Sequence, residues 1–221
     1  MVKTLLTLFT FLLVTLNSAI GNDDDINPEQ FSKDLNIELN RFLESKDTKQ
    51  NYLRLLELEG QAIQISEGEP LKLGSIGSAI LDIYPYSQTG HYVLSLFYGH
   101  LDSLEAKQSH EQSLRLIQRY MTDNGSGEST DPYPILTIND AKTFAKTSGN
   151  SPVGSTYRTT EDITLGLLLL AQKKESPLKY WFYDLSKVLA ALEPESNDKE
   201  AQGWPLIREL ANASDSAAQV A

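Results

Sequence analysis

The chain has 221 residues, no cysteine and a formal net charge of −11, and 40% of its residues are hydrophobic. This is the composition of a globular protein, and the length allows one domain or two small ones. The lack of cysteine excludes disulfide frameworks, thiol catalysis and thiolate metal sites. The negative charge argues against nucleic acid as a partner, because nucleic acid repels anions.

Residues 1–21 have the pattern of a secretory signal peptide. Lys3 is their only charged residue, an apolar run from Leu5 to Leu16 follows it, and small residues end the segment. We expect cleavage after Ala19 or Gly21 and export to the bacterial periplasm or the exterior. An uncleaved N-terminal anchor is the alternative. No cysteine follows the small residues and no stop-transfer stretch is present, so we expect no stable membrane anchor.

Apolar residues then recur at three- and four-residue spacing, which is typical of amphipathic helices. Asn27 suits the N-cap of the first helix and Pro28 its first position. Gly74 and Gly77 lie inside a predicted helix and permit another helix to approach closely. The residues from Gly99 to Asp102 suit a turn. The predicted helices cover residues 28–43, 52–60, 71–83, 91–98 and 103–121.

After residue 122 the pattern changes toward a period of two. A loop of sequence DNGSGESTD precedes a predicted strand from Tyr133 to Ile138, and Asn139 suits the cap of a short helix over 140–148. Further strands are expected at 156–160, 163–171 and 178–185, the last two forming a hairpin around 173–177. A short helix is predicted from Lys187 to Leu192.

These elements predict an α+β protein, with helical hairpins in the N-terminal half and a small antiparallel sheet with a short helix in the C-terminal half. The expected organisation has four parts. They are a signal peptide at 1–21, a helical hairpin domain at 22–122, a small α+β module at 123–192 and an acidic, Ala- and Ser-rich, partly disordered tail at 193–221.

The segment HYVLSLFYGHLDSLEAKQSHEQSLRLI resembles one degenerate tetratricopeptide repeat, with Tyr98 and Ala106 near that motif's Tyr and Ala positions. No second copy follows at a fixed period, so a repeat array is not expected.

A longer resemblance covers residues 85–185. The residues that carry it are His91, Tyr92, Tyr98, Ala106, His110, Asn124 to Ser129, Ile135 to Ile138 and Tyr180 to Asp184. Through them the chain resembles an uncharacterised family of secreted bacterial proteins, in which a tetratricopeptide-like helix pair leads into a small α/β module. Ser126 departs from that pattern, where Asp is usual. The resemblance implies architecture and compartment, and it brings no catalytic motif.

The chain's three histidines fall within one predicted helical hairpin. Folding at the 99–102 turn would bring His91 and His110 to facing positions, with Glu111 nearby. Imidazole is a common zinc ligand and general base, so these residues are a candidate metal or polar site. No pair has HExxH or i, i+4 spacing, which favours packing or surface histidines instead.

Two other segments are candidates for binding. The run Tyr180, Trp181, Phe182, Tyr183 would place Trp181 and Tyr183 on one face of a strand and Tyr180 and Phe182 on the other. One face is expected in the core, and the other is a candidate binding surface.

The second segment is the glycine loop, which contains Asn124, Gly125 and Gly127. A calcium loop or an anion nest would suit its composition. Glycines at alternate positions offer no side-chain ligand, and the acidic neighbours repel anions, so a turn that links two modules is favoured.

No nucleotide-binding, P-loop or serine-hydrolase motif is present, and no cofactor is expected. The function expected from the sequence is non-catalytic binding of a protein or peptide outside the cytoplasm, with a basic partner favoured by the acidic charge. One specific version is an immunity or inhibitor protein for a secreted toxin. The alternative is a periplasmic hydrolase or metal-dependent enzyme that uses His91 or His110.

Overall fold

A computed structural model describes residues 27–159, 164–171 and 179–192. The predicted signal peptide, the 173–177 loop and the 193–221 tail lie outside these residues. The described helices are α2 (Pro28–Leu43), α3 (Thr48–Ile65), the 3-10 helix η1 (Pro70–Lys72), α4 (Leu73–Ile83), α5 (Gln88–His100), α6 (Leu104–Asp123), α7 (Ile138–Thr147) and α8 (Ser186–Leu192). The strands are β1 (Ser151–Thr159), β2 (Thr164–Ala171) and β3 (Lys179–Asp184).

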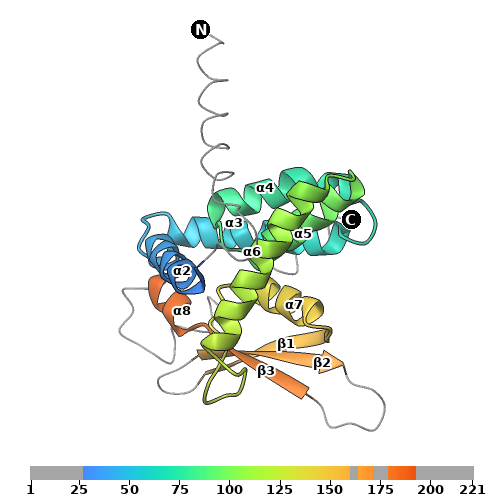
Figure 1. Cartoon of the computed structure of the whole chain (residues 1–221). Coiled ribbons are helices and arrows are strands. Elements are labelled where there is room, and N and C mark those ends of the chain that lie inside the picture. The colour runs from blue at the N-terminus through green and yellow to red at the C-terminus, as the bar shows by residue number, and fades with distance from the viewer. Residues whose placement is uncertain (1–26, 160–163, 172–178, 193–221) are drawn as a thin grey trace.

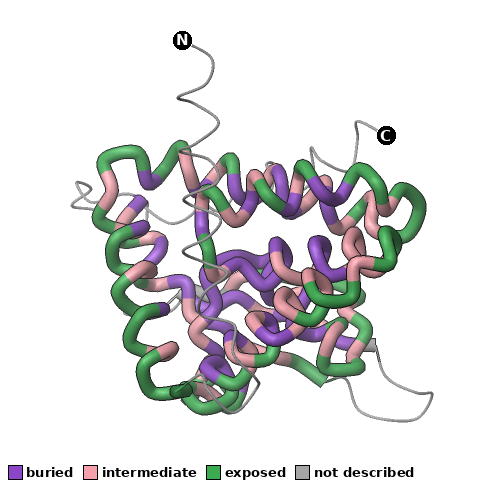
Figure 2. The backbone as a smooth tube through the Cα atoms, turned by 45° about the horizontal axis from the view of Figure 1, so that its top comes forward, coloured by how far each residue is buried: buried purple, intermediate pink, exposed green. Residues whose placement is uncertain are grey.

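The predicted α+β class is confirmed. The helices up to α6 form one layer, and the three-stranded antiparallel sheet, in the order β1-β2-β3, lies below it with α7 between them (Figure 1). One cluster of buried side chains joins the two layers, because it includes Leu55 of α3, Ile117 of α6, Phe144 of α7 and Leu168 of β2. Figure 2 shows these buried residues gathered between the layers, with the exposed ones around them.

The first helix begins as the sequence predicts. Asn27 caps it, with the side-chain oxygen accepting a hydrogen bond of 2.9 Å from the backbone N–H of Glu29, and Pro28 opens it. Gly60 does not end the next helix, because α3 continues to Ile65.

The helices α4 and α5 pack as an antiparallel pair with their backbones close together. A Cβ atom added at Gly74 would come within 2.6 Å of the Phe97 side chain, and one added at Gly77 within 2.6 Å of Leu94. The expected use of these glycines as close-approach positions is confirmed.

The prediction for residues 133–139 is wrong. Only an isolated parallel bridge from Tyr133 to Tyr183 forms there, and Ile138 is already the first residue of α7. Thr137 caps α7 in place of Asn139, because its side chain accepts the hydrogen bond from the backbone N–H of Asp140. The side chain of Asn139 donates instead to the carbonyl of Leu56 at 3.0 Å and so ties α7 to α3.

The predicted hairpin is confirmed, with β2 and β3 paired from Leu165↔Asp184 to Leu170↔Lys179. Gly149 has a φ of +76° and follows α7, as a helix-terminating glycine does. No helix within the described ranges combines the length and the apolar character needed to cross a membrane.

Candidate functional site

A buried polar cluster lies where α3, α5 and α7 meet. Its members are Glu59 of α3, Ser87 and Thr89 at the start of α5, and Thr137 and Asp140 at the start of α7. Glu59 is 0% exposed and Asp140 is 1% exposed. Two buried carboxyl groups need hydrogen-bond partners, and the starts of α5 and α7 supply them.

Helix capping positions the cluster. Ser87 caps α5 by accepting a hydrogen bond of 3.1 Å from the N–H of Gly90, and Thr137 caps α7 by accepting one of 3.0 Å from the N–H of Asp140. Both helices therefore present their N-terminal ends to the cluster. The positive end of a helix dipole stabilises a negative charge, so a carboxylate is favoured there.

The hydrogen bonds divide between the two carboxyl groups. Asp140 Oδ1 accepts from the backbone N–H and from the hydroxyl of Thr89, both at 2.9 Å. Glu59 Oε2 accepts from the Thr137 hydroxyl at 2.6 Å. Ser87 Oγ lies between them, 2.8 Å from Glu59 Oε1 and 3.1 Å from Asp140 Oδ1.

Burial raises the pKa of the Glu59 carboxyl well above its usual value, and the charge of Asp140 raises it further. Burial also raises the pKa of Asp140, but the hydrogen bonds from Thr89 and Ser87 act in the opposite direction. Asp140 is therefore the better place for a negative charge, and Glu59 the better place for a proton.

Sequence reasoning missed this cluster, although two signals were present. Glu59 falls on the same helical stripe as Leu55, Leu56 and Ala62, so a charged residue occupies a core position. Thr137 and Asp140 have the spacing of a capping box, which identifies the start of α7. A cavity of about 90 Å³ lies between α2, α6 and α8 and borders Asp140, yet Asp140 itself is only 1% exposed. The cluster is thus not open to an external substrate.

The structure brings His91 and His110 together but leaves Glu111 out. The two Nδ1 atoms lie 3.0 Å apart, and His91 Nε2 lies 3.0 Å from the carbonyl oxygen of Pro85. Glu111 pairs with Lys107 at 3.6 Å. In the described ranges, no three His, Asp or Glu side chains are grouped so that they could hold a metal ion.

The partners of the histidine pair fix its protonation. A carbonyl only accepts, so His91 Nε2 carries a hydrogen and its Nδ1 is the acceptor for His110 Nδ1–H. Burial, with the neighbouring His110, lowers the pKa of His91 to about 3, and burial also lowers the pKa of His110. A proton added to His91 Nδ1 would place two N–H groups against each other, so the pair is built to remain neutral.

The histidine pair should make the fold less stable in acid. Below about pH 6.5 the unfolded chain binds protons at these histidines that the folded pair does not bind, so the contribution of the pair to the free energy of unfolding should fall as the pH is lowered toward 3. We expect His91→Gln to reduce this loss relative to the parent protein, measured by urea unfolding at a series of pH values.

The control for this experiment is His100→Gln, because His100 is exposed. That variant should keep the parent's pH dependence. Parallel acid profiles for the parent and His91→Gln would show that the pair is not responsible.

The aromatic run of β3 divides as its alternation predicts. Tyr183 is buried, and Trp181 packs against Phe144 with their ring centroids 5.2 Å apart, so this face belongs to the core. Tyr180 and Phe182 lie on the outer face of the sheet, where Tyr180 is exposed. Only these two members of the run are thus placed to form a binding surface.

The glycine loop pairs with the sheet. The N–H groups of Ser126 and Gly127 both donate to the carbonyl of Asp131 at 3.0 Å, and the Gly127 carbonyl accepts from the N–H of Phe182 at 2.9 Å. Asn124 donates from its side chain to the carbonyl of Tyr120 at 2.8 Å. Each of these contacts ties the loop to the protein itself, and the loop joins α6 to the sheet layer.

A groove of about 390 Å³ runs between the start of α2 and the end of α6, lined in part by Phe31, Leu116 and Tyr120. The Tyr120 hydroxyl donates to Asn36 Oδ1 at 2.8 Å and so joins α6 to α2. Arg119 and Asp123, 3.5 Å apart, neutralise each other at its edge.

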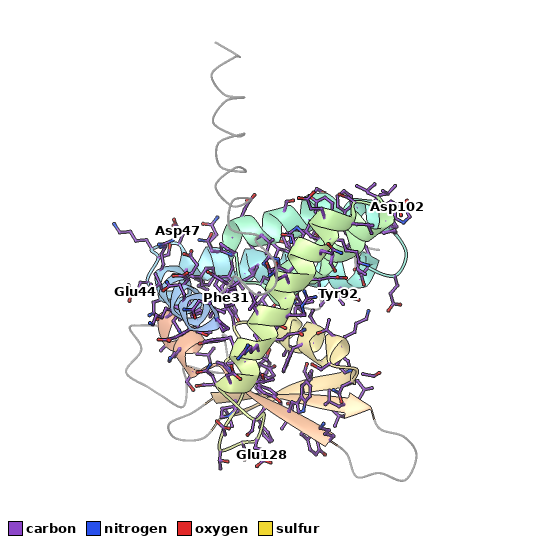
Figure 3. All side chains as sticks on the ribbon, in the orientation of Figure 1. Phe31, Glu44, Asp47, Tyr92, Asp102 and Glu128 are labelled. Atoms are coloured by element: carbon purple, nitrogen blue, oxygen red, sulfur yellow. The ribbon has the colours of Figure 1, made fainter. Side chains whose placement is uncertain are left out.

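Three exposed leucines gather at one end of the helical layer. Leu71, Leu101 and Leu104 are 60%, 49% and 65% exposed, and we call them the leucine tip. The antiparallel packing of α4 and α5 places Leu71 level with Leu101, and Leu104 begins the next helix after a short turn. The α3–α4 connection and the α5–α6 turn lie at this same end (Figure 1), and Figure 3 shows Asp102 projecting there.

Comparison of the chain with protein-family models, with curated proteins and with solved structures finds no match.

Proposed function

We propose that the protein is a non-catalytic binding module that acts outside the cytoplasm and holds a basic partner at the leucine tip. The observation that carries this proposal is the set of three leucines, each about half exposed or more, at one end of the fold. Exposed apolar side chains are normal when scattered, but a group of them marks an interaction site. The signal-peptide pattern of residues 1–21 supports the compartment.

The charge around the leucine tip supports a basic partner. Asp102 and Glu105 are exposed and flank Leu101 and Leu104 in the sequence. Among the described residues, neither of these two carboxylates forms an ion pair. The whole chain has a formal net charge of −11. A partner that fits this surface is a segment in which apolar side chains such as leucine alternate with lysines or arginines. The negative charge of the protein would also attract such a segment to the surface.

A titration tests the proposal. The probe is a fluorescent amphipathic helical peptide of leucine and lysine, and its counterpart has glutamate in place of lysine. Fluorescence anisotropy should show binding of the lysine peptide that weakens as salt is raised. The double variant Leu101→Ala/Leu104→Ala should bind about tenfold more weakly, because truncation removes the central anchors.

Ile37→Ala is the matched control, since Ile37 is 57% exposed on α2 and lies outside the leucine tip. It should bind as the parent does. Equal affinity of the parent and the leucine-tip variant, or equal weakening by Ile37→Ala, would refute the assignment of this surface.

Metal analysis tests the alternative of a metal-dependent enzyme. Zinc that is bound by the parent and lost in His110→Ala would contradict a role limited to binding. We expect neither protein to retain zinc, since only two histidines meet in the described site.

A further inference from the structure

The buried polar cluster holds a second feature, which is independent of the proposed binding function. Glu59 and Asp140 approach the same serine hydroxyl from two different helices, and both are closed off from solvent. Two ionised carboxylates in such a place would repel each other with little solvent screening.

The hydrogen count shows how the cluster avoids this. Ser87 Oγ already accepts from the N–H of Gly90 and has one hydrogen to give, yet it lies within hydrogen-bond distance of an oxygen of both carboxyl groups. One of the two carboxyl groups must therefore be protonated and donate a hydrogen bond to Ser87 Oγ.

The remaining contacts locate that hydrogen. Asp140 Oδ1 receives two hydrogen bonds from Thr89, which suits a carboxylate. The Thr137 hydroxyl accepts from the N–H of Asp140, so its own hydrogen goes to Glu59 Oε2 and leaves Oε1 as the site for a proton. The chain of donors then runs from Glu59 to Ser87 and from Ser87 to Asp140.

We infer that Glu59 and Asp140 share one proton that locks α3, α5 and α7 together, and that the fold weakens when alkaline pH removes it. Removal leaves two negative charges across one serine. The surrounding titratable groups do not offset them, because Tyr52 of α3, Tyr84 before α5 and Tyr120 of α6 are phenols whose pKa values burial raises. Asp184 and Lys187, of opposite charge, line the cavity on the other side of Asp140.

The sign of the pH dependence follows from the proton count. Unfolded Glu59 has a pKa of about 4.3, so above that pH the folded protein binds one proton more than the unfolded chain. The equilibrium constant for unfolding should then rise by up to about tenfold per pH unit, until the pH passes the folded-state pKa of Glu59. Stability is gained toward the acid side of this window and lost toward the alkaline side.

Glu59→Gln is the decisive variant. Its amide can donate to Ser87 and accept from Thr137 as the protonated acid does, but it never ionises. Urea unfolding of the full chain from about pH 5 to pH 9 should give a ratio of parent to variant unfolding constants that rises by about tenfold per unit over part of this range. Asp140→Asn should shorten the pH range over which this slope holds, because it removes the charge of Asp140 while burial still raises the pKa of Glu59.

A direct measurement keeps the inference testable if a variant fails to fold. Carbon-13 NMR of the Glu59 carboxyl in the intact parent protein should show the protonated form at neutral pH. A carboxylate shift at that pH, or parallel pH profiles for the parent and Glu59→Gln, would overturn the shared proton.

Discussion

Replacement of Gly166 by alanine is expected to destabilise the protein by about 3 kcal/mol. Gly166 of β2 lies opposite Tyr183 of β3, and the tyrosine ring covers the glycine so closely that an added Cβ would overlap it. Tyr183 is 1% exposed and lies within the core between the sheet and the helices, so its ring cannot turn away without displacing neighbours. Urea unfolding measures the loss.

Gly154→Ala is the matched control on the neighbouring strand. A Cβ at Gly154 would meet nothing closer than a Leu169 methyl at 3.9 Å, so we expect no loss, or a small gain from the lower entropy of the unfolded chain. Equal losses at the two glycines would mean that strand propensity, not the Tyr183 ring, sets the cost.

Thr137→Val should also lower the free energy of unfolding by about 3 kcal/mol, because the threonine hydroxyl forms two buried hydrogen bonds. It caps α7 by accepting from the N–H of Asp140, and it donates to Glu59. Valine has nearly the same shape, so packing is kept while both hydrogen bonds are lost and their partners stay buried. Thermal and urea unfolding report the change.

Thr137→Ser keeps the hydroxyl and should cost only about 1 kcal/mol, for the lost methyl group. Asn27→Ala removes a cap that lies at the surface and should cost about 1 kcal/mol as well. A loss of only about 1 kcal/mol for Thr137→Val, as expected for a surface cap, would indicate that the hydrogen bond to Glu59 contributes little to stability.

Elements with a strong apolar periodicity, or with residues that start or end a helix, could be predicted from the sequence. Asn27 and Pro28 mark the start of α2, and Gly149 marks the end of α7, because these residues act through local backbone geometry. The segment from Tyr133 to Ile138 misled the prediction, since an apolar run without a clear period suits a strand or a buried connection equally well.

The candidate site was predictable only in part, because only some of its contacts join residues that are close in the sequence. His91 and His110 are joined by one short turn, so their encounter follows from local helix geometry. Glu59 and Asp140 meet across 81 positions of the chain, and their contact depends on how α3 and α7 pack, which no spacing encodes. The cover of Gly166 by Tyr183 likewise needs the strand register.

The junction of α3, α5 and α7 also constrains the order in which the chain can assemble. Tyr52 donates to the carbonyl of Leu136, and Asn139 to that of Leu56, so the interior of the early helices is completed by residues made about 80 positions later. Closure of such long loops is slow and has to precede the contacts that stabilise it. Until residues 136–140 have been synthesised, the face of α3 that they cover in the folded protein has no partner. During that interval its apolar side chains are exposed, and a chaperone that holds unfolded chains could bind them.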